Sequence, residues 1–128
     1  MTGWTSQELN RVGTAEELEI AFLRGDGTLG RPRTIWVVPH EDGLYVRSVN
    51  GPTSAWFRGA QVRHQGHISA GGIDKDVTFA DADPDLNDAL DVAYRDKYRR
   101  YSTATLDRIT SPEARSTTIQ LVPRSTTS

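Results

Sequence analysis

The sequence contains no cysteine, only one methionine and no long hydrophobic run. Without cysteine the chain has no disulfide bond, thiolate metal site, iron–sulfur cluster or cysteine nucleophile. The first ten residues are polar, so they predict no secretory signal peptide. We therefore expect a cytoplasmic protein with no membrane-spanning segment.

An excess of charge of one sign is also lacking, because 15 Lys and Arg residues face 17 Asp and Glu residues. The formal net charge of −2 argues against sequence-independent binding of nucleic acid. Hydrophobic residues make up 36% of the chain, which is enough for a folded core. The 128 residues fit one domain, which we place at residues 1–124, followed by a disordered tail at residues 125–128.

Alternating and β-branched segments predict six strands, and turn residues separate them. Helices are expected from the capping box at Thr5–Glu8, over 55–61, from Asp83-Pro84 and over 103–109. Because the strands lie at hairpin separations, the predicted fold is a largely antiparallel sheet that closes into a small barrel, with helices added. The expected strands are 17–24, 34–38, 44–49, 62–70, 73–80 and 117–122.

Three motif matches have simpler explanations than the sites they resemble. Residues 25–30 read G-x-G-x-x-G, but a β-branched strand follows where a dinucleotide site needs a helix. Residues 81–85 resemble the start of a calcium loop, yet helix capping explains their carboxylates better. His64 and His67 point to opposite faces of a strand and have no third ligand in sequence, so we predict no metal site.

The loop before the second predicted strand carries two guanidinium groups, those of Arg31 and Arg33, followed by the hydroxyl of Thr34. These groups suit a phosphate or carboxylate, although a solvated turn whose arginines pair with local carboxylates is the alternative. The segment Ser48-Val49-Asn50-Gly51 ends the partner strand and should lie beside this loop. Ser54 then begins a helix whose free N–H groups add to an anion site.

Aromatic residues on two predicted helices have two readings each. Trp56 and Phe57 either wall an aromatic ligand or fill the end of the barrel. Tyr94, Tyr98 and Tyr101 share one helix face, which is first of all a packing stripe. A phenol directed into a pocket would instead bind a substrate or donate a proton.

The segments Gly30-Arg31-Pro32-Arg33-Thr34, Leu44–Gly51 and Ala55-Trp56-Phe57, in this order, resemble the deazaflavin-dependent nitroreductase family of split β-barrels. From Trp4 to Arg124 the sequence also resembles the small bacterial family of unknown function numbered 2255, a distant branch of that group. The resemblance implies a flavin-reductase-like split barrel that binds F420 or FMN and acts on a small organic molecule. It also implies a possible homodimer, as many split barrels form.

Carried over by position, the resemblance implies that Tyr98 or Tyr101 donates a proton on the substrate side. Reductases of this kind carry basic residues where this chain has Gly27-Thr28-Leu29, so fewer positive charges meet the cofactor tail. FMN, a smaller phosphate ligand or a cofactor-free barrel (a cyclase, isomerase or carrier) are therefore alternatives to F420. The implied cofactor-binding residues are Arg31, Arg33, Thr34, Ser48, Asn50, Gly51, Ala55 and Trp56.

Overall fold

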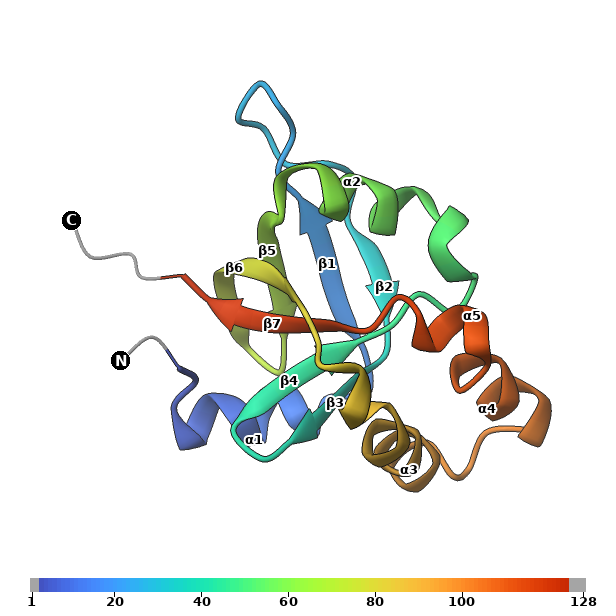
Figure 1. Cartoon of the computed structure of the whole chain (residues 1–128). Coiled ribbons are helices and arrows are strands. Elements are labelled where there is room, and N and C mark those ends of the chain that lie inside the picture. Colours follow the sequence, from blue (N-terminus) through green and yellow to red (C-terminus); the bar gives the residue numbers. More distant parts are fainter. Residues whose placement is uncertain (1–2, 125–128) are drawn as a thin grey trace.

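The structure is a computed structural model that describes residues 3–124, and the predicted tail at 125–128 lies outside this part of the chain. Strands and helices follow one another along the chain as drawn in Figure 1. The strands are β1 (Leu18–Phe22), β2 (Arg33–Ile35), β3 (Val37–His40), β4 (Gly43–Val46), β5 (Gln65–Ala70), β6 (Ile73–Asp81) and β7 (Ile119–Pro123). The helices are α1 (Ser6–Gly13), α2 (Ala55–Arg63), α3 (Asn87–Lys97), α4 (Thr103–Ile109) and α5 (Pro112–Arg115), with short 3-10 helices η1 (Gly51–Thr53) and η2 (Pro84–Leu86).

The described strands form one antiparallel sheet in the order β2-β1-β5-β6-β7-β4-β3. The two edge strands, β2 and β3, are neighbours in sequence and are separated only by Trp36. The sheet must therefore curl until its edges approach, and it nearly closes into a barrel (Figure 1). The predicted antiparallel barrel with added helices is confirmed.

The predicted number of strands is wrong, because the structure has seven and the sequence predicted six. The run expected as one strand at 34–38 is divided at Trp36 into β2, which pairs with β1, and β3, which pairs with β4. Trp36 leaves the sheet to stack on Tyr98 of the region after α3, with ring centroids 3.9 Å apart and planes inclined by 4°. This contact between residues distant in sequence turns the chain from one edge of the sheet to the other.

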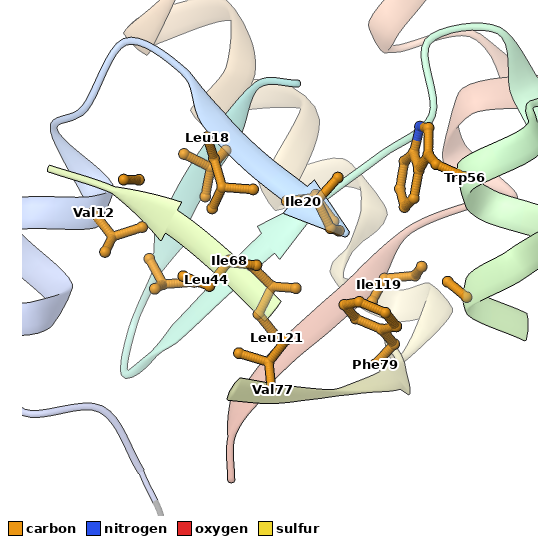
Figure 2. Packing of buried hydrophobic residues seen from close by; sticks show 14 of the residues in the cluster. Val12, Leu18, Ile20, Leu44, Trp56, Ile68, Val77, Phe79, Ile119 and Leu121 are labelled. Carbon is orange, nitrogen blue, oxygen red and sulfur yellow. The ribbon is translucent and has the colours of Figure 1, made fainter. Parts of the chain in front are cut away.

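The interior of the barrel is filled by aliphatic side chains from most strands (Figure 2). Leu18 and Ile20 of β1 are buried on either side of the exposed Glu19, and Ala21 is buried as well. Phe79 of β6 closes over Gly66 of β5, where a Cβ atom would lie 2.6 Å from its ring. Removing this apolar surface from water is the main source of stability of the barrel.

A second core lies between β3 and β4 and the helices α3 and α4. Val38 and Tyr45 contribute to it from the sheet, and Leu90, Tyr94 and Leu106 from the helices. Because β4 also buries residues in the barrel, both of its faces are covered, and all four of its residues are buried. Its neighbouring strand, β7, is thereby held in the middle of the sheet.

Local sequence signals give the helix starts correctly. The Thr5–Glu8 capping box is present at the start of α1, and Asp83 caps η2 just ahead of α3. The strand expected at 62–70 begins only at Gln65, because α2 continues to Arg63 and ends where His64 takes a left-handed conformation. No helix within residues 3–124 has both the length and the apolar character that crossing a bilayer requires.

Candidate functional site

A cavity of about 510 Å³ lies between β2, the segment after β4, the start of α2 and α4. This volume is within the range of small-molecule sites. The wall is polar on several sides and carries two tryptophans. The lining residues are Glu17, Arg33, Thr34, Ile35, Trp36, Arg47, Ser48, Val49, Asn50, Ser54, Ala55, Trp56, Thr105, Arg108 and Ile109.

Six of the eight residues predicted to bind a cofactor line this cavity, and two do not. Arg33 is held on β2 opposite Ile20 of β1, and its side chain is exposed and has no ion-pair partner within residues 3–124. Arg31 stands in the loop before β2, exposed and outside the cavity wall. Gly51 is buried against Glu113 and also lies outside the wall. The six lining residues are Arg33, Thr34, Ser48, Asn50, Ala55 and Trp56.

Arg108 is a cavity residue that the sequence analysis missed. It lies in the last turn of α4, and its Nη2 donates to Asn50 Oδ1 over 2.8 Å. The sequence predicted the helix over 103–109, but no local signal placed α4 against Asn50. Arg108 thus adds a second exposed guanidinium to the cavity, from a different wall than Arg33.

The first turn of α2 also faces the cavity, through Ser54, Ala55 and Trp56. The Ser54 side chain makes no capping hydrogen bond, and its Oγ lies 2.8 Å from Ser48 Oγ. The hydroxyl of Ser48 also donates to Gly51 O over 2.7 Å, so it fixes the turn between β4 and α2. The first N–H groups of α2 are therefore uncapped beside the cavity, as an anion site requires.

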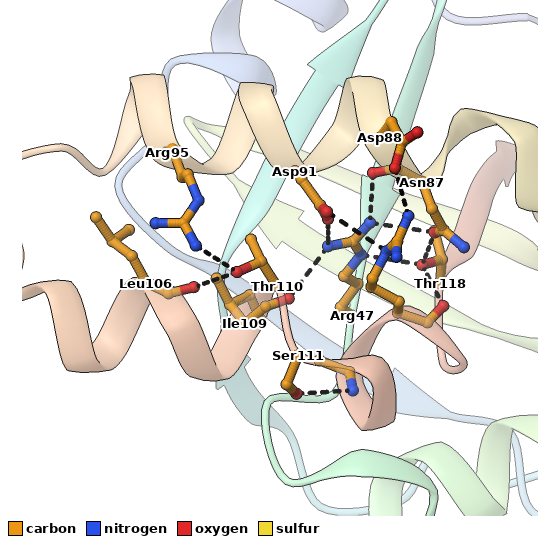
Figure 3. Close-up of polar contacts among 12 residues, drawn as sticks. Arg47, Asn87, Asp88, Asp91, Arg95, Leu106, Ile109, Thr110, Ser111 and Thr118 are labelled. Atoms are coloured by element: carbon orange, nitrogen blue, oxygen red, sulfur yellow. Dashed lines mark hydrogen bonds and ion pairs between the residues drawn. The ribbon is translucent and has the colours of Figure 1, made fainter.

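Arg47 also lines the cavity, but its charge is already neutralised by Asp91; Figure 3 shows the contacts of its guanidinium. Its side chain is 0% exposed and makes an ion pair of 2.5 Å with Asp91 of α3. Its other bonds reach Thr118 Oγ1 (3.0 Å), Ile109 O (3.1 Å), and Asn87 O and Oδ1 (3.2 and 3.1 Å). All five N–H groups are used, so Arg47 ties the helices to the sheet and is not free to bind a ligand.

Two tryptophans give the cavity aromatic surface. Trp56 is largely buried at the start of α2 and meets Phe57 edge to face, with ring centroids 6.1 Å apart. Trp36 is half-buried and lies against Tyr98 on one ring face. These indoles suit a planar aromatic ligand.

The tyrosines predicted to donate a proton do not line the cavity. The hydroxyl of Tyr98 donates to Glu16 O over 2.9 Å and also meets the backbone of Val37. The hydroxyl of Tyr101 donates to the Glu16 carboxylate, and burial, above all, raises the pKa of Tyr98. Lys97 lies over the Tyr98 ring, and burial lowers its pKa to about 8. The geometry gives both phenols a packing role, and their catalytic role stays a prediction.

The two histidines of the sequence motif do not converge. His64 ends α2 and is exposed. His67 lies on β5 between Asp76 and Asp74 of β6, at 2.9 and 3.2 Å. Among residues 3–124 no group of three or more His, Cys, Asp or Glu side chains is arranged to hold a metal ion.

Solved structures with the same fold include a protein described as an F420 reductase. It has 16% sequence identity and a TM-score of 0.61, with 93% of each chain covered. A NimC/NimA family protein from Clostridium acetobutylicum has 16% identity and a TM-score of 0.57, covering 91% of this chain and 79% of that one. A putative 5-nitroimidazole antibiotic resistance protein from Bacteroides thetaiotaomicron has 16% identity and a TM-score of 0.53, covering 93% and 79%. At these identities the likeness shows a shared barrel fold.

Sequence comparison agrees with the resemblance given above at the level of the family. No curated protein matches the chain. A family described as "Uncharacterized protein conserved in bacteria (DUF2255)" matches residues 8–121, which is most of the chain. The protein therefore belongs to the DUF2255 family, with a barrel fold shared by an F420 reductase and NimC/NimA-like proteins.

Proposed function

We propose that the cavity binds a flavin-type cofactor, FMN or F420, and that the protein is an oxidoreductase acting on a small organic molecule. The observation that carries this proposal is the pair of exposed arginines, Arg33 and Arg108, on two walls of a cavity that also holds two tryptophans. An anionic group and a planar ring are what such a wall recognises.

The anionic part of the cofactor is assigned to the arginines and the start of α2. Arg33 and Arg108 supply charge-assisted hydrogen bonds, and the uncapped N–H groups beside Ser54 add the positive end of a helix dipole. Asn50 holds Arg108 through Oδ1, so its guanidinium is oriented before a ligand arrives. A preoriented side chain loses less conformational entropy on binding.

The ring of the cofactor is assigned to the aromatic part of the wall, formed by Trp36 and Trp56. When bound, the cofactor supplies hydride transfer, in which its reduced form becomes oxidised while the substrate gains the hydride and a proton from water. The residues of the chain orient the ring and exclude water from one of its faces.

A cofactor-free barrel is the competing function, and two observations favour the cofactor instead. Arg33 and Arg31 have no ion-pair partners within residues 3–124, so the solvated-turn reading of paired arginines has no support. The volume of about 510 Å³ also leaves space for a tricyclic ring.

The test is a fluorescence titration of FMN and of F420 with the purified protein. We expect saturable binding of at least one of them. Arg33→Ala should weaken that binding about tenfold, because it removes one charge-assisted hydrogen bond to the ligand. The fold should survive, because the Arg33 side chain is exposed.

Arg31→Ala is the matched control, because Arg31 is also exposed and only two residues away, but lies outside the cavity. Its affinity should equal that of the wild type. Failure of both cofactors to bind at tens of micromolar would refute the proposal. An equal loss in both arginine variants would remove this cavity as the site.

A further inference from the structure

One end of the cavity has a different chemistry from the arginine walls, because it holds Glu17 and Trp36. Leu18 of β1 pairs with Ile35 of β2 at the end of the ladder. Glu17 and Trp36, the next residue beyond that pair on each strand, therefore lie beside each other. Arg33 stands at the other end of β2, about 10 Å away over three residues of extended chain. The cavity is therefore polarised along β2, from a cation to a carboxylate.

Trp36 is half-buried and lines the cavity at this end. One face of its ring stacks on Tyr98 at 3.9 Å. Tyr101 lies 4.8 Å from Trp36 and 5.9 Å from Tyr98, and these three distances put it beside the edge of the indole. Tyr98 is itself anchored through its hydroxyl to Glu16 and Val37. The indole is thus a platform held in place by two tyrosines, and it lines the cavity with the part that stays exposed.

Glu17 is the one carboxylate among the residues that line the cavity. The preceding residue, Glu16, is occupied by Arg100 and Tyr101. Glu17 has no ion-pair partner within residues 3–124, although a carboxylate can accept several hydrogen bonds. An exposed carboxylate without an ion-pair partner, next to an aromatic platform, fits the N–H edge of a planar heterocycle.

We infer that Glu17 and Trp36 select a ring that carries an N–H donor, Trp36 by stacking on the ring and Glu17 by accepting from the N–H. This inference rests on the proposed function, in which the opposite, anionic end of the ligand lies toward Arg33. Flavin and deazaflavin rings have such a donor at N3. Glu17 is accordingly a specificity-determining residue.

The experiment compares FMN and F420 with their N3-methyl derivatives, which keep the ring and the phosphate but lack the donor. The wild-type protein should bind the parent compound about tenfold or more tightly than the methylated one. In Glu17→Ala the ratio of the two affinities, that for the parent compound over that for the methylated one, should fall to nearly one. Glu17→Gln, which keeps a neutral acceptor, should show an intermediate ratio.

Glu19→Ala is the matched control, because Glu19 is exposed on the same strand and does not line the cavity. It should keep the wild-type ratio. If a parent cofactor binds but the ratio is near one, or is unchanged in Glu17→Ala, the inference is wrong and the proposed function stands. If neither parent cofactor binds, both are wrong.

Trp36 is tested separately with the same titrations. Trp36→Phe keeps a smaller stacking surface, and Trp36→Leu removes it, so affinity should fall in that order. Thermal unfolding of each variant monitors the joint between β2 and β3. Equal affinity in all three proteins would exclude Trp36 as the platform.

Discussion

Replacing Arg47 with methionine should destabilise this fold strongly. The guanidinium is 0% exposed and makes five hydrogen bonds, and Met would remove all of them. Asp91, which is 23% exposed, would keep only Arg115 Nε at 3.4 Å. Breaking a buried ion pair on one side costs about 3–5 kcal/mol. A domain of this size has a total stability of about 5–15 kcal/mol, and Asp91 keeps Arg115, so a loss of about 3 kcal/mol is expected, a fifth or more of the total.

Urea unfolding followed by tryptophan fluorescence measures this loss. Arg95→Met is the matched control, because Arg95 also binds an aspartate, Asp107, and a threonine hydroxyl, Thr110. Its side chain and that of Asp107 are 46% and 61% exposed, so the loss should be about 0–1 kcal/mol. A loss below about 1 kcal/mol for Arg47→Met would refute the view that this arginine binds the helices to the sheet.

Two further predictions concern β5. Gly66→Ala should destabilise the barrel strongly, because its Cβ would lie 2.1 Å from Ala21 O; thermal unfolding measures this, and an unchanged Tm would contradict it. Burial lowers the pKa of His67, but Asp76 and Asp74 raise it more, so it ends above its ordinary value of 6.5. The protonated form therefore stabilises the fold below about pH 6.5, and this contribution is lost as the pH rises through the raised pKa. The unfolding free energy at about pH 5 minus that at about pH 9 should be smaller, with its sign kept, in His67→Gln than in the wild type; an unchanged value would contradict the sign.

Where one short segment determines an element, the sequence was sufficient to predict it. The Thr5–Glu8 capping box and the Asp83-Pro84 helix start are local, because every bond that forms them lies within a few residues. The extended conformation of β2 and β3 is also a local preference of β-branched residues. The break at Trp36 is not local, since its cause is a ring 62 positions further on.

The candidate site divides in the same way. Arg33 and Asn50 were predicted to be neighbours from the hairpin order, and the cavity includes both. Arg108 was missed because α4 reaches Asn50 only through the tertiary packing of α3, α4 and the sheet. Arg31 and Arg33 look equivalent in sequence, but pairing with β1 begins at Arg33, so only this residue has a fixed place on the sheet.

The central position of β7 has a consequence for how the protein is made. β7 pairs with β6 on one side and β4 on the other, and Trp4 donates its indole N–H to Leu121 O over 2.9 Å. Until residues 119–123 have left the ribosome, β3 and β4 have no partner that joins them to the other half of the sheet. Until then the two halves of the sheet have unpaired strand edges, which can associate with other chains. Folding is completed only when β7 inserts between β6 and β4.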